Sequence, residues 1–130
     1  EAVKTALEKD GWKITDDPLF IKFGGVEMYV DIGAEKLIGA EKNGQKIAVE
    51  IKSFLGISIT SEFQDALGQV LFYQVALRET HPERVLFLAV PVAIYENFFN
   101  LELPQMVLQN YNVRLIVYNE LKGEVIKWLT

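Results

Sequence analysis

The chain has 130 residues and a mass of 14.8 kDa, which is the size of one domain and excludes a two-domain enzyme. It contains no cysteine, which excludes disulfide frameworks, zinc–thiolate sites and thiol catalysis and favours a cytoplasmic location. The net charge of −5 argues against passive coating of DNA but not against a small nuclease with clustered carboxylates. No apolar run is long enough to span a membrane, so we expect a soluble protein without membrane contact.

The first half of the chain predicts one helix followed by β-strands. Apolar residues recur at helical spacing over residues 1–10, and Gly11 is a natural stop after them. Alternating and β-branched residues, separated by Gly-Gly and Asn-Gly turns, then predict strands at 12–15, 19–23, 26–32, 36–42 and 45–54. The last of these segments has the clearest strand pattern of the whole chain.

The second half predicts a long helix and then a mixture of strands and short helices. Ser61 and Gln64 have the spacing of a capping box, and apolar residues follow at helical spacing to about Glu79. Strands are expected at 85–90, 113–118 and 124–129, and helices at 93–99 and 104–110. The order of elements predicts one α/β domain over residues 1–130, with a central mixed β-sheet flanked by helices.

Glu50 and Lys52 are the first candidates for chemistry. They lie two residues apart on the clearest predicted strand, so their side chains leave the same face. Alone, this pattern favours a solvated surface strand over a site. Asp31 changes that balance, because its apolar neighbours would bury its carboxylate, and a buried carboxylate needs a partner. Two carboxylates beside a lysine are hard oxygen ligands that suit Mg²⁺ or Mn²⁺.

Other polar residues give weaker signals. Gln69 and Tyr73 are four residues apart on the long predicted helix and therefore share one face. Such a pair more often forms a hydrogen-bonded border of the core than a site. His81 is the one histidine and lies at the expected helix end, where a surface or capping role is favoured over catalysis. Catalytic triads and glycine-rich nucleotide motifs are not indicated.

Five large apolar residues crowd one short stretch of the second half, more than a short helix readily turns inward. These residues are Phe98, Phe99, Leu101, Leu103 and Met106. Part of this stretch is expected in the core. The excess predicts a homodimer or a complex with another protein.

In chain order, Asp31, Glu50-Ile51-Lys52 and Gln69-x-x-x-Tyr73 resemble the PD-(D/E)xK nuclease superfamily, whose αβββαβ core also matches the expected elements. Val30 stands where the superfamily signature has proline. More specifically, the chain is similar to the XisH family, the excision-controlling factors of the fdxN element. This likeness runs over nearly the whole chain, and the segments that carry it are 2–12, 30–35, 49–54 and 127–128.

The resemblance implies a restriction-endonuclease-like fold with a metal site. Asp31, Glu50 and the carbonyl group of Ile51 would bind Mg²⁺ or Mn²⁺. Glu1 is a further candidate ligand, because some superfamily members supply an acidic residue from the first helix. Its place at the start of a helix suits a solvated helix-dipole residue equally well.

The remaining implied roles belong to Lys52, Gln69 and Tyr73. Lys52 would orient or help to deprotonate a water molecule and would stabilise the developing phosphorane charge. Gln69 would hold Lys52 or a phosphate oxygen, with Tyr73 as its neighbour.

Three functions remain open at this point. The first is a metal-dependent endonuclease that hydrolyses a DNA phosphodiester in support of excision or rearrangement of a DNA element. The second is a non-cutting accessory factor that binds DNA or a recombinase to control excision. The third is an interaction module in which Asp31, Glu50 and Lys52 form only a buried ion network.

Overall fold

The computed structural model describes residues 1–28, 31–32 and 35–130, with the backbone alone for residues 31, 32 and 35. The helices are α1 (Ala2–Lys9), α2 (Ile59–Thr80), α3 (Val92–Ile94), the π-helical turn η1 (Tyr95–Phe99) and α4 (Glu102–Asn110). The strands are β1 (Lys13–Asp16), β2 (Ile21–Phe23), β3 (Val26–Met28), β4 (Asp31–Ile32), β5 (Glu35–Lys42), β6 (Gln45–Lys52), β7 (Arg84–Pro91), β8 (Arg114–Asn119) and β9 (Glu124–Leu129).

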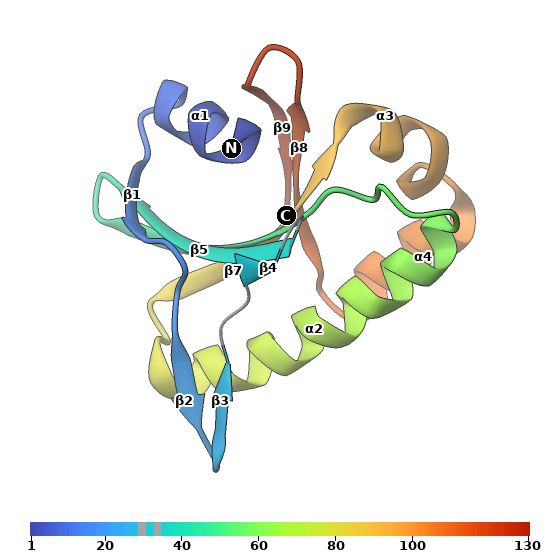
Figure 1. Ribbon diagram of the computed structural model, residues 1–130. Helices are drawn as coiled ribbons and strands as arrows, with labels where there is room; N and C mark the ends of the chain where they lie inside the picture. Colours follow the sequence, from blue (N-terminus) through green and yellow to red (C-terminus); the bar gives the residue numbers. More distant parts are fainter. Residues whose placement is uncertain (29–30, 33–34) are drawn as a thin grey trace.

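A mixed sheet with the order β1-β5-β6-β7-β8-β9 forms the centre of the structure (Figure 1). β6, β7 and β8 are parallel, whereas β5 and β9 are antiparallel to their neighbours. The short strand β4 also pairs with β5, beside β1. The hairpin β2–β3 forms a separate two-stranded sheet. The predicted α/β class with a central mixed sheet flanked by helices is confirmed.

The two faces of the central sheet carry separate apolar cores, because side chains alternate along each strand. Figure 1 shows α1 on one side of the sheet and α2 on the other. On the α1 side, Val3 and Leu7 share a cluster with Val49 and Ile51 of β6. On the α2 side, the helix packs on a cluster that includes Leu37, Ala48, Leu88 and Leu115. β6 is therefore covered on both faces.

The long helix begins earlier than the sequence predicts. Ser58, with an extended backbone, is the N-cap of α2, and its hydroxyl oxygen accepts a hydrogen bond of 3.2 Å from the Ser61 amide. Ser61 therefore lies within the first helical turn, and the prediction that it caps the helix was wrong. The opposite end agrees with the sequence, since His81 is the C-cap and its amide donates to the Leu77 carbonyl.

The strand predicted over residues 26–32 is divided in the structure. β3 ends at Met28 and pairs with β2, whereas β4 pairs with β5 of the central sheet. Residues 29 and 30 lie outside the described part of the chain. The division follows from two competing partners, because the Gly24-Gly25 turn, with positive φ at both glycines, directs β3 back onto β2.

The crowded apolar stretch is only partly inside. Phe99 is buried and Phe98 half-buried, and both rings contact Phe63 of α2. Leu101, Leu103 and Met106 remain exposed. None of the described helices is both long and apolar enough to cross a membrane.

Candidate functional site

Glu50 and Lys52 are buried, with exposed fractions of 0% and 5%. Both side chains face α2, because Ala48 belongs to the core on that side while Val49 and Ile51 belong to the core on the α1 side. The solvated surface strand that the Glu-x-Lys pattern alone would favour is therefore not the setting of this pair. β6 lies between β5 and β7 in the sheet, and the core on the α2 side covers the face that carries this pair.

The surroundings of Glu50 within the sheet are apolar. Its register neighbours are Leu37 on β5 and Leu88 on β7, and both are buried. A carboxylate in such a place costs free energy unless charge or hydrogen bonds compensate it. Glu50 and Lys52 each have an interaction partner in the structure. A buried pair of opposite charge in the centre of a sheet is thus the feature that needs a functional or structural reason.

Asp31 lies on β4. This strand pairs with β5, which forms a hairpin with β6, the strand that carries Glu50 and Lys52. The Asp31 backbone is in register with Lys36 on β5, and Lys36 is in register with Ile51 on β6. Asp31 is therefore two strands from β6, a backbone separation of about 10 Å. The side chain of Asp31 lies outside the described part of the chain, so its meeting with Glu50 stays a prediction.

Gln69 and Tyr73 lie on the same side of the sheet as Glu50. Tyr73 is buried in the core that contains Leu37 and Leu88, the two neighbours of Glu50. Gln69 is half-buried, and its Oε1 atom is buried without a hydrogen bond to any described residue. A buried acceptor without a donor costs about 1–3 kcal/mol. The Gln69 carbonyl group can therefore accept from a donor such as a lysine ammonium group or a water molecule.

Glu1 lies elsewhere, in an ion network near α1. Its carboxylate is 3.3 Å from Lys4 Nζ, and Lys4 Nζ is 2.7 Å from Asp17 Oδ2. Lys36 Nζ lies 2.9 Å from Asp17 Oδ1. Hydrogen bonds from Lys4 and Lys36 lower the pKa of Asp17, and the hydrogen bond from Lys4 lowers the pKa of Glu1. Glu1 is therefore already engaged by a cation.

The structure does not bring Glu1 to Glu50. Lys36 alternates with Leu37 on β5, and Leu37 faces α2, so the network lies on the α1 side of the sheet. A role for Glu1 as metal ligand stays a prediction. Sequence reasoning missed Asp17 and Lys36, because the network joins α1, the turn after β1 and β5, and no spacing in the sequence signals it.

The candidate metal ligands at β6 would bind a metal ion through oxygen atoms. Within the described part of the chain, no three His, Cys, Asp or Glu residues lie close enough together to hold a metal ion. Glu50 would therefore need the Asp31 carboxylate and a main-chain oxygen to complete a site. Ile51 is the last residue of β6 in register with β7, which places its carbonyl group near the end of that ladder.

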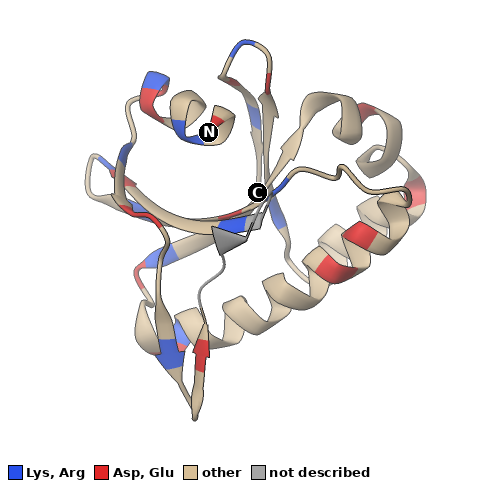
Figure 2. Cartoon of the chain, viewed as in Figure 1, with Lys and Arg blue, Asp and Glu red and all other residues tan. Residues whose placement is uncertain are grey.

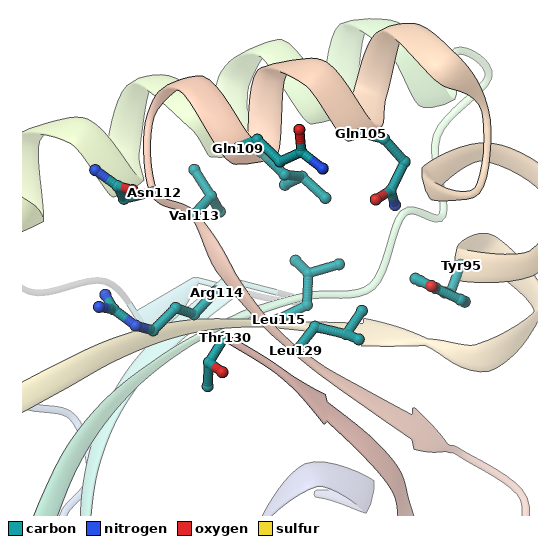
Figure 3. Close-up of a pocket in the computed structure, with 10 residues that line it drawn as sticks. Tyr95, Gln105, Gln109, Asn112, Val113, Arg114, Leu115, Leu129 and Thr130 are labelled. Carbon is teal, nitrogen blue, oxygen red and sulfur yellow. The ribbon is translucent and has the colours of Figure 1, made fainter.

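A separate pocket of about 360 Å³ lies between α4, β8 and β9 (Figure 3). Its polar lining includes Gln105, Gln109, Asn112 and Arg114, and Figure 3 shows the Arg114 side chain extending away from Tyr95. None of the site residues predicted from the sequence lines this pocket. The lining residues lie on or beside η1, α4, β8 and β9 and form no motif, so sequence reasoning could not find the pocket.

Comparisons with known proteins agree on one family. The sequence model described as XisH protein matches residues 1–126. An XisH family protein from Nostoc punctiforme PCC 73102 has 48% identity and a TM-score of 0.92, with 99% of this chain and 96% of that chain covered. An fdxN element excision controlling factor protein from Anabaena variabilis has 49% identity and a TM-score of 0.92, with 99% and 95% covered. No curated protein matches the chain. By sequence over nearly its whole length and by fold, the chain belongs to the XisH family.

Proposed function

We propose that this chain is a metal-dependent, endonuclease-like protein that hydrolyses a DNA phosphodiester during excision or rearrangement of a DNA element. The observation that carries this proposal is the burial of Glu50 and Lys52 side by side on one face of the central strand. A charged pair in an apolar core carries a desolvation penalty, and buried ionisable groups of this kind are candidates for a functional site. The name of the relative from Anabaena variabilis, an fdxN element excision controlling factor, supports the biological setting.

The arrangement of elements supports a restriction-endonuclease-like core. α1 covers one face, β5 and β6 form an antiparallel hairpin, and α2 crosses the other face before β7 pairs parallel to β6. This order matches the αβββαβ plan of PD-(D/E)xK nucleases. On this proposal, Glu50 and Lys52 at the end of β6 would be the acidic residue and the lysine of such an enzyme.

The donors fit Mg²⁺ or Mn²⁺. Glu50, Asp31 and the Ile51 carbonyl group are hard oxygen donors, and the chain has no cysteine to favour a softer metal. When bound there, the ion would supply Lewis-acid polarisation of a phosphate oxygen and lower the pKa of a water molecule.

Two side chains on the α2 side would act on the substrate itself. Lys52 is a cation held in a low-dielectric setting, so its charge can stabilise the negative charge that develops on the phosphate. The Gln69 carbonyl group would accept a hydrogen bond from the Lys52 ammonium group and keep it oriented. Tyr73 would limit the movement of Gln69 one helical turn away.

A non-cutting accessory role is the second candidate, and the charge distribution favours it. There is no Lys or Arg between Lys52 and Arg78, nor between Arg84 and Arg114. Figure 2 accordingly shows acidic but no basic residues over η1, α4 and the first half of α2. Residues 53–77 and 85–113 therefore offer no cation of their own to a DNA backbone. It suits contact with a protein such as a recombinase better than contact with DNA.

Cleavage of DNA by purified protein separates the two functions. Supercoiled plasmid and branched duplexes are incubated with Mg²⁺ or Mn²⁺, and nicking is followed on gels. We expect nicking that stops in chelator and falls roughly 10²–10³-fold in Lys52→Met. Lys46→Met is the matched control, because Lys46 is exposed on the same strand and should leave the rate unchanged.

Two results would contradict the enzymatic proposal. If the wild-type protein binds DNA but never cuts it with either metal, the accessory role replaces it. If cutting survives equally in Lys52→Met and Glu50→Gln, the activity comes from another site or another protein.

A further inference from the structure

The outer face of α2 is uncharged and apolar where a solvated helix face is normally polar. No charged residue lies between Asp65 and Arg78, as Figure 2 shows for the middle of the helix. On this stretch Gly68 is exposed, and Phe72 and Val75 have exposed fractions of 60% and 52%. Three helical turns with apolar residues on the exposed side indicate that something covers this face.

The hairpin β2–β3 extends this apolar surface. A pocket of about 360 Å³ separates the hairpin tip from α2 and is lined by Phe23, Val26 and Met28 on one side and Leu71, Phe72 and Val75 on the other. Phe23 and Val26 are themselves exposed. Small-molecule sites combine apolar walls with a few placed polar groups, and the residues that line this pocket supply none. The pocket suits apolar side chains of a protein.

We propose that this face binds a second copy of the same chain, with the two α2 helices packed antiparallel across a two-fold axis near Phe72. The exposed residues Asp65, Gly68, Phe72 and Val75 follow one another at spacings of three, four and three, which is the seam of a helix pair. An antiparallel arrangement centred between Leu71 and Phe72 sets Gly68 opposite Val75 of the second copy. A hypothetical Cβ at Gly68 has nothing within 4 Å, so the position leaves room for that side chain.

The charges at the ends of the seam are complementary under the same symmetry. Asp65 precedes the apolar stretch and Arg78 follows it, so an antiparallel pair brings Asp65 of each copy toward Arg78 of the other. Both residues are exposed. The hairpin adds no net charge, since Lys22 and Glu27 form a cross-strand pair at 3.6 Å. A surface with a negative charge at one end of the seam and a positive charge at the other is self-complementary in an antiparallel pair.

The exposed apolar surface at the start of α4 is not self-complementary in charge. Leu101, Leu103 and Met106 are accompanied by Glu102 and have no basic residue between Arg84 and Arg114. Two such surfaces would bring acidic residues together across a two-fold axis and repel each other. Of these two surfaces, the α2 face is therefore the one that fits its own copy.

The exposed aromatic rings supply part of the apolar area that a dimer uses. Phe23 and Phe72 are each about half exposed, and together they offer roughly 200 Å² per copy. A standard interface buries about 800 Å² per partner, and rather more than half of that area is apolar. The two rings supply the centre, and the remaining exposed side chains of α2 and the hairpin tip supply the rest.

Light scattering and sedimentation velocity across the micromolar range test the proposal on the full chain. We expect a wild-type mass of twice 14.8 kDa. Phe72→Glu should raise the dissociation constant at least about 100-fold, because it removes the central ring and sets two like charges near the axis. Leu103→Glu is the matched control, since Leu103 is an equally exposed helix residue on the other surface and should leave the dimer intact.

Asp65 and Arg78, at the two ends of the seam, give a second test that does not depend on replacing an apolar residue. Asp65→Arg should weaken the dimer roughly 5–30-fold, and the double variant Asp65→Arg with Arg78→Asp should restore most of that loss. Circular dichroism on every variant confirms that it folds. A wild-type monomer at high micromolar concentration would overturn the proposal. So would a dimer that survives Phe72→Glu and fails to respond to the charge exchange.

Discussion

Replacing Phe99 with alanine is expected to lower the free energy of unfolding by about 3–5 kcal/mol. Phe99 is completely buried, and its ring lies edge-on to three others, those of Phe54, Phe63 and Phe98, at centroid distances of 5.7, 5.0 and 5.3 Å. The cluster joins the segment after β6, the first turns of α2 and η1. A cavity here therefore loosens the element that follows Lys52 as well as the core.

Urea denaturation followed by circular dichroism measures the effect. Leu103→Ala is the control, because Leu103 has an exposed fraction of 70% and its truncation should change stability by no more than about 0.5 kcal/mol. Equal losses in the two variants would mean that the Phe99 cluster does not hold the second half of the chain together.

The second large effect concerns two neighbouring residues on β6 that face opposite sides of the sheet. In chelator, Glu50→Gln should be neutral or stabilising, because it removes a buried charge from a site that lacks its cation. Val49→Ala should cost about 1–3 kcal/mol, because Val49 is completely buried in the core on the α1 side. Both free energies come from the same denaturation experiment.

A larger loss of stability in Glu50→Gln than in Val49→Ala would indicate a structural role for Glu50. If Glu50→Gln lowers the free energy of unfolding by about 3–5 kcal/mol, then Glu50 and Lys52 form a structural ion network. Removing one partner of that network leaves the other charge buried and uncompensated. The enzymatic proposal would lose its main support in that case.

Local pattern was sufficient to predict most of the elements. The turn at Asn43-Gly44 fixes the hairpin of β5 and β6, with Asn43 and Gly44 both at positive φ, and the bounds of β9 agree with the sequence. The start of α2 was missed because Ser58 and Ser61 are both good caps by type. Only the extended backbone of Ser58 decides between them.

The site was predictable in its residue types but not in its environment. The Glu-x-Lys pattern says that two side chains share a face, and it cannot say whether that face is covered. The position of β6 between β5 and β7, with α2 above it, depends on pairings far apart in the sequence. The same holds for Glu1, which the fold places across the sheet from Glu50 because β5 directs Lys36 and Leu37 to opposite sides.

Exposed surfaces were the least predictable feature. The crowded stretch from Phe98 to Met106 suggested an interface. Phe99 is buried in the core, however, and the exposed residues Leu101, Leu103 and Met106 lie close to the acidic residue Glu102 in the sequence. The sequence did not reveal the apolar outer face of α2, because helical periodicity does not distinguish an inner from an outer stripe when both are apolar.

The most direct test of the central claim is the response of stability to Mn²⁺ in the wild-type protein and in Glu50→Gln. A metal ion at about 100 times its dissociation constant should add ~2.7 kcal/mol to the free energy of unfolding of the wild type. Glu50→Gln and Asp31→Ala should each abolish this gain, whereas Glu124→Gln, at an exposed carboxylate on β9, should keep it. An equal gain in the wild type and Glu50→Gln, or no gain in the wild type, would contradict a metal site at the end of β6.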